Sequence, residues 1–242
     1  MGATTGSLTG RWRARAASAV DALVRPEQFF GERPDPSLLA PTGVVLLSAA
    51  LRCLLALPFL YMLRFVVEPS ELRWAAGLMV VVILGYALGR WLLLAAVVYA
   101  TSWWLDGEGR FRDLLAYLGW SHLPNVLGGV VLVPAALFVV ASVDPPTSEA
   151  AVAEFARNVS GNPLVQLDAA YGMVSARTGA SMSRLQFAVG VGQFAWGAYV
   201  WFAVAKVGRN LDGRRALWAI AIPVVVTGLI VGLESIDVGV VF

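Results

Sequence analysis

The fold class is decided by one apolar stretch, residues 74–105, which reads WAAGLMVVVILGYALGRWLLLAAVVYATSWWL. Its 32 residues include a single charged side chain, Arg90. About 20 helical residues suffice to cross a hydrocarbon core of about 30 Å. Because lipid offers no partner to an unpaired backbone N–H or C=O group, a helix is the expected form. The stretch is longer than one perpendicular crossing requires, so it must tilt, bend or extend beyond the bilayer.

Four other apolar stretches accompany this one, at residues 42–63, 123–142, 185–207 and 216–233. The chain is 58% hydrophobic and 14% charged, with a mean hydropathy of +0.71. We therefore expect an all-α integral membrane protein with five transmembrane helices and short interfacial helices, and not a soluble enzyme.

The basic residues lie mostly on one side of these five stretches. The side that contains the N-terminal tail holds eleven of them, and the opposite side holds five. The eleven are Arg11, Arg13, Arg15, Arg25, Arg33, Arg110, Arg112, Lys206, Arg209, Arg214 and Arg215. The positive-inside rule thus predicts a plasma-membrane protein with a cytoplasmic N-terminus and an extracytoplasmic C-terminus.

Two parts are expected along the chain: a cytoplasmic tail, residues 1–41, and a five-span membrane domain, residues 42–242. In the tail, residues 8–24 fit a basic amphipathic helix that lies on anionic headgroups. A disordered basic tail that only sets the topology is the alternative. Pro26 suits the first turn of a short helix. The adjacent pair Phe29 and Phe30 suggests anchoring at the membrane interface.

A short interfacial helix is predicted just before the third span, at residues 111–120, from apolar residues at helical spacing. Gly119 and Pro124 interrupt this pattern, so a break or sharp kink should fall between them. The polar pair Ser121 and His122 would then face protein or water instead of lipid.

The outer loop at residues 143–183 should contain two helices, at residues 148–158 and from Pro163 to about Arg177, the second stopped by Gly179. Asn158 begins a glycosylation tripeptide in this loop. Two GxxxG patterns, at residues 85–89 and 228–232, predict close helix packing.

Enzyme chemistry finds little support in the residue inventory. One His and one Cys allow neither a His/Cys metal cluster nor an intrachain disulfide. The chain contains no HExxH, GxSxG or phosphate-binding Walker motif. We expect no enzymatic activity, no metal, no cofactor and no nucleic-acid partner.

Polar residues within the apolar stretches are the remaining sign of function, because burying charge in lipid is costly. Arg52 and Arg90 lie inside the first and second stretches, and His122 and Asn125 lie at the predicted break. These four residues could bind an anion, most plausibly a phospholipid headgroup. Alternatively, the two arginines extend to the interface or donate to backbone carbonyls that broken helices expose.

Several motifs occur in a fixed order along the chain. Arg-Pro-Glu-Gln-Phe-Phe precedes the first span, Gly-Glu-Gly-Arg-Phe lies between spans two and three, and Gly-Trp-Ser-His-Leu-Pro leads into span three. Together with Leu211–Ala216 after span four, this set resembles the YIP domain family of Ypt/Rab-interacting membrane proteins, in its prokaryotic branch. The motif residues are Arg25, Pro26, Phe29, Phe30, Gly107, Gly109, Phe111, Gly119, Trp120 and Pro124.

The resemblance implies a five-helix membrane domain with no established catalytic residue. The expected function is membrane organisation or shaping, or partner recruitment, in a prokaryote. The alternative is a small transporter, channel or lipid-handling protein that uses the buried arginines. The expected partners are the lipid bilayer, an anionic phospholipid and a protein at the cytoplasmic tail; the oligomeric state is left open.

Overall fold

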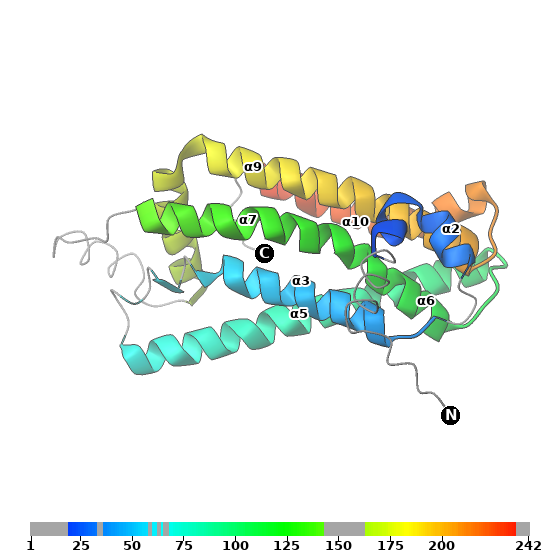
Figure 1. Cartoon of the computed structure of the whole chain (residues 1–242), viewed down its shortest axis with the longest axis horizontal. Helices are drawn as coiled ribbons and strands as arrows, with labels where there is room; N and C mark the ends of the chain where they lie inside the picture. The colour runs from blue at the N-terminus through cyan, green and yellow to red at the C-terminus, as the bar shows by residue number, and fades with distance from the viewer. Residues whose placement is uncertain are drawn as a thin grey trace, which may run out of the picture. The chain divides into compact units, whose positions relative to one another are not determined.

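The computed structural model describes residues 19–32, 36–57, 60–61, 64, 68–142 and 163–235. Side chains are described in these ranges except at residues 139–142, 163–183 and 230–235. Within them the regular secondary structure is all helical, with no strand (Figure 1). The principal helices are α2 (Pro26–Gly31), α3 (Leu39–Leu55), α5 (Pro69–Trp104), α6 (Phe111–Gly119), α7 (Leu123–Ser142), α9 (Pro163–Gly208) and α10 (Gly213–Ser235), with a 3-10 turn, η1 (Trp120–His122). The all-α prediction is confirmed for this part of the chain.

The helices divide between two compact units, each formed from three segments. The motif unit, as we call the first, consists of Met1–Val45, Arg90–Pro124 and Ala195–Val225. The second consists of Leu46–Gly89, Asn125–Phe194 and Val226–Phe242.

Three helical segments of the described chain are long and apolar enough to cross a membrane. They are Pro69–Trp104, Phe111–Phe138 and Arg184–Gly208. Helix α3 is a shorter apolar helix of 17 residues, and α10 contains the fifth predicted stretch. The membrane character is therefore supported, while the count of five spans and their orientation remain predictions.

The first apolar stretch is largely helical in the residues that the structure describes. Helix α3 ends at Leu55, whereas the predicted span continued to residue 63. Beyond it, Leu57, Leu60 and Tyr61 are also helical, and the Leu60 N–H donates to the Ala56 carbonyl at 3.1 Å. Residues 58, 59, 62 and 63 lie outside the described part of the chain, so the end of this span at residue 63 stays a prediction.

The predicted break before the third span is a local tightening of the helix. The 3-10 turn η1 separates α6 from α7, between Gly119 and Leu123. Both of those residues keep right-handed helical backbone angles, with φ of −61° and −56°. A sharp kink is thus not required at this place. Ser121 and His122 are 7% and 5% exposed, which confirms that they face protein.

Helix α9 begins at Pro163 as predicted but does not stop at Gly179, because it continues without interruption to Gly208. A glycine inside a helix costs only about 1 kcal/mol relative to alanine, which a long helix tolerates. The predicted stop was therefore wrong. The predicted helix at residues 148–158 and the Asn158 tripeptide lie outside the described residues.

Only the second of the two GxxxG patterns has a glycine in close helix contact among the described residues of the second unit. A Cβ atom added at Gly85 or Gly89 would meet nothing within 4 Å. One added at Gly129 would lie 2.8 Å from Leu51 Cβ. Gly228 does approach a side chain, at 3.3 Å from the ring of Phe194. GxxxG is common by chance in glycine-rich apolar sequence, which explains the first miss.

Candidate functional site

The motif unit is built around one buried cation, Arg209, which is 1% exposed. Its Nε donates to Ser102 Oγ at 2.8 Å, and its Nη2 donates to the Gly107 carbonyl at 2.8 Å. Its Nη1 donates to the Gly109 carbonyl. The planar guanidinium group thus holds the end of α5 and the loop that follows it, from a position about 100 residues later in the chain.

An aromatic ring completes the environment of this cation. The guanidinium carbon of Arg209 lies 4.4 Å from the ring centroid of Tyr99, which favours the charge. Tyr99 in turn contacts Phe111 edge to face, with centroids 5.5 Å apart. Burial lowers the pKa of the Arg209 guanidinium, yet an arginine side chain stays protonated at physiological pH. Its hydrogen-bond partners among the described residues are all neutral oxygens.

The two motif glycines of the α5–α6 loop make this geometry accessible. Gly109 has φ of +95°, a conformation that L side chains rarely adopt. A Cβ atom on Gly107 would lie 2.7 Å from the Ser102 carbonyl oxygen. That carbonyl accepts the Gly107 N–H at 2.8 Å, and Glu108 N–H donates to Arg209 O at 2.9 Å. Glycine at these two positions therefore lets the Gly107 and Gly109 carbonyls reach the Arg209 guanidinium group.

The outer sides of the α5–α6 loop and of the loop that joins α9 to α10 are polar and exposed. Arg215 lies 3.7 Å from Asp106 and 3.5 Å from Asp212, and these side chains are 51%, 86% and 62% exposed. Asp212 also accepts the backbone N–H of Arg215 at 2.9 Å, which caps the start of α10. Asn210 donates to Glu108 at 3.2 Å. We call these five residues the loop surface: Asp106, Glu108, Asn210, Asp212 and Arg215. Arg209 fixes its backbone by bonding the Gly107 and Gly109 carbonyls.

Helix α2 packs beside α6 in the same unit (Figure 1). Phe29 meets the ring of Trp120 at 5.2 Å, and Phe30 meets that of Tyr117 at 5.1 Å. The two phenylalanines are 4% and 1% exposed. Their predicted role as interfacial anchors is therefore wrong: they belong to the protein core. The proline expected in the first turn of α2 is confirmed.

Two further contacts fix α2 and the start of α3 in this unit. Lys206 Nζ lies 2.7 Å from Glu27 Oε2, a half-exposed ion pair that joins α9 to α2. Gly119 lies against Pro41, since an added Cβ would come within 2.5 Å of the proline Cβ. Pro41 is fully buried, so it has little room to move.

Comparison with known proteins places this architecture in a family. A family model described as the Yip1 domain matches residues 20–234. This chain belongs to the Yip1 domain family. It is also similar to the uncharacterized protein MJ0794 of Methanocaldococcus jannaschii, at 25% identity over 125 residues, which are 50% of this chain and 89% of the relative. No solved structure matches the chain.

The family motif residues of this Yip1 domain gather in the motif unit. The buried ones lie in α2, at the end of α6, in η1 and at the start of α7: Pro26, Phe29, Phe30, Gly119, Trp120 and Pro124. These six residues thus have a packing role, and Gly107 and Gly109 make room for the contacts of Arg209.

The predicted anion-binding residues are divided between the two units. Arg90 and His122 belong to the motif unit, and Arg52 and Asn125 belong to the second. Arg52 lies half-buried with its guanidinium carbon 5.8 Å from the ring centroid of Tyr86. A common site formed by these four residues therefore remains a prediction.

Sequence reasoning missed Arg209 as the central residue of this Yip1 domain. In the sequence it is one of four bases between spans four and five, and its neighbours Gly208 and Asn210 are typical of a loop. Arg209 is the buried one of these four bases because the α5–α6 loop packs against it. Among the described residues, no cluster of His, Cys, Asp or Glu side chains could hold a metal ion.

Proposed function

We propose that this Yip1 domain is a non-enzymatic, five-span protein of the plasma membrane whose cytoplasmic end recruits a protein partner and thereby organises the membrane. One observation carries the proposal: the loop surface is exposed and polar, yet its backbone is fixed by the buried Arg209, whose three nitrogens each donate to a protein oxygen. A buried guanidinium group that uses all three of its nitrogens to hold protein oxygens supports a structural role instead of a catalytic one.

A fixed surface favours recognition because less conformational entropy is lost when a partner binds. The loop surface presents carboxylates and a guanidinium group in defined positions, which gives directional hydrogen bonds and charge complementarity. The positive-inside count supports a cytoplasmic location for these loops and for the tail at residues 1–41. The partner is therefore expected to be a cytoplasmic or membrane-associated protein with a complementary charged face.

Photocrosslinking in native membranes, followed by quantitative mass spectrometry, tests this proposal. Glu108→Lys reverses a charge on the loop surface, and Glu71→Lys makes the same change at the start of α5, in the other unit. We expect Glu108→Lys, or deletion of residues 1–18, to reduce the recovery of a partner at least about fivefold, while Glu71→Lys retains it. Equal recovery with all three variants would contradict recruitment through this end.

A further inference from the structure

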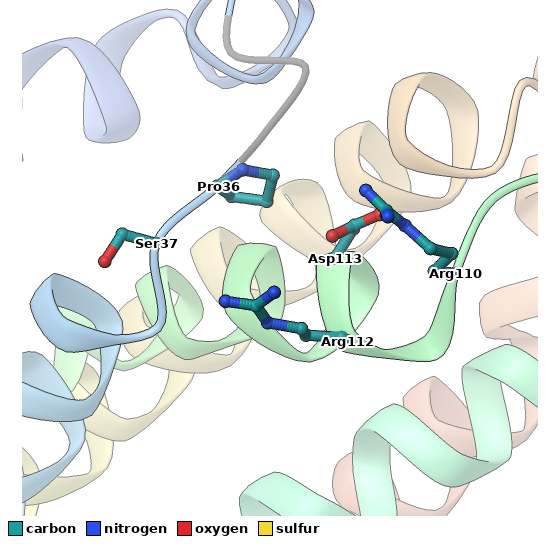
Figure 2. A pocket seen from close by; sticks show the side chains of 5 residues that line it. All are labelled: Pro36, Ser37, Arg110, Arg112 and Asp113. Atoms are coloured by element: carbon teal, nitrogen blue, oxygen red, sulfur yellow. The ribbon is translucent and has the colours of Figure 1, made fainter.

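A hollow of about 240 Å³ lies in the motif unit, and neither Arg209 nor the residues of the loop surface line it. Its lining comes from the segment before α3 and from the start of α6: Pro36, Ser37, Arg110, Arg112 and Asp113 (Figure 2). Four of these five side chains are polar. Pockets for drug-sized ligands are larger, about 300–1,000 Å³, and mostly apolar. The hollow therefore suits a small, charged group.

The charges of the hollow favour an anion. Its single carboxylate, Asp113, is paired with Arg110, whose Nε lies 3.0 Å from Asp113 Oδ2. The second guanidinium group, on Arg112, gives the lining a net positive charge. Figure 2 shows Arg112 extending along the hollow toward Ser37, while Arg110 reaches over Asp113. The Ser37 hydroxyl accepts the Leu39 N–H at 3.2 Å and keeps its own proton as a donor.

Exposed tryptophans in the same unit suggest that its loop end lies at the depth of lipid headgroups. Trp103 and Trp104, at the end of α5, are 71% and 84% exposed, and Trp218 in α10 is 63% exposed. Tryptophan is enriched at the interface between hydrocarbon and water, where its amphipathic ring is stable. All three belong to the motif unit, and α6 begins seven residues after Trp104. Basic side chains at this depth are well placed to meet a phosphate group.

We infer that the hollow beside Arg112 binds a phosphate group, through the guanidinium groups of Arg112 and Arg110 and the Ser37 hydroxyl. The phosphate can belong to an anionic phospholipid headgroup or to free inorganic phosphate. The inference rests on the proposed function for one point, namely that this region lies at the cytoplasmic surface of the membrane. An arginine pairs with phosphate through two parallel hydrogen bonds, a geometry that lysine does not offer.

Native mass spectrometry of the full-length protein in detergent tests the inference. The probes are phosphatidylglycerol, zwitterionic phosphatidylcholine and inorganic phosphate. We expect the protein to retain phosphatidylglycerol over phosphatidylcholine and Arg112→Gln to weaken this retention about fivefold. Arg214→Gln removes the same charge from an exposed position of the same unit and should leave retention unchanged.

Competition separates the two sources of the phosphate. Displacement of phosphatidylglycerol by millimolar inorganic phosphate would assign the hollow to the free anion, whereas retention would assign it to the lipid headgroup. Equal retention of the two lipids without any phosphate adduct, or an equal loss in Arg112→Gln and Arg214→Gln, would overturn the inference. Binding in detergent does not depend on sidedness or on a protein partner, so this result is independent of the test of the proposed function.

Discussion

Replacing Arg209 by methionine should destabilise this Yip1 domain by about 3–5 kcal/mol, because one buried and two partly buried oxygens lose a charged donor at once. The cation that lies over Tyr99 is lost with them. The apparent melting temperature in detergent, followed by fluorescence-detected size-exclusion chromatography, should fall by roughly 10 °C.

Two further variants separate this effect from a loss of charge. Arg214→Met removes a charge from an exposed position and should change stability by no more than about 0.5 kcal/mol. Arg209→Lys keeps the charge, but one ammonium group cannot reproduce the planar set of three bonds, so it should restore little of the stability. If Arg209→Met melts like Arg214→Met, the assignment of Arg209 as the centre of the motif unit is wrong.

Phe30→Ala is expected to cost about 3–5 kcal/mol, the usual range for removing a fully buried aromatic ring. The ring is 1% exposed and contacts Phe29 and Tyr117 at centroid distances of 5.2 and 5.1 Å. The variant would leave a cavity between α2 and α6. Its unfolding midpoint should therefore fall well below that of the wild type.

The matched control is Phe187→Ala in α9, at a phenylalanine that is 50% exposed. It should lose much less stability than Phe30→Ala. An interfacial anchor would behave differently, because truncating Phe30 would then weaken contact with lipid and leave the midpoint in detergent nearly unchanged. That outcome would restore the anchoring role that the sequence suggested.

Local sequence patterns predicted the helices that local forces dominate. Helix α7 has the predicted boundaries, and α5 contains nearly all of the 32-residue stretch that indicated a membrane protein. The start of α2 followed from Pro26, because proline is favoured in the first turn of a helix. The burial of His122 followed from the cost of placing a polar group against lipid.

The features that the sequence did not reveal depend on contacts between distant segments. The hydrogen bonds of Arg209 join positions 100 to 107 residues apart, and no local pattern distinguishes it from the exposed Arg214. Phe29 and Phe30 were assigned to the interface because their partners in α6 and η1 could not be inferred from spacing. Gly119 contacts Pro41, and this contact likewise depends on tertiary packing.

Cysteine accessibility at the two ends of α5 tests the central claim most directly, namely that this helix crosses the membrane with the loop surface in the cytoplasm. Ser70 and Glu108 are both exposed, and replacing Cys53 by serine removes the only native cysteine. In spheroplasts, an impermeant maleimide should label Ser70→Cys but label Glu108→Cys only after the membrane is opened. Labelling of Glu108→Cys in sealed spheroplasts, with Ser70→Cys protected, would contradict the orientation, and labelling of both would contradict the span itself.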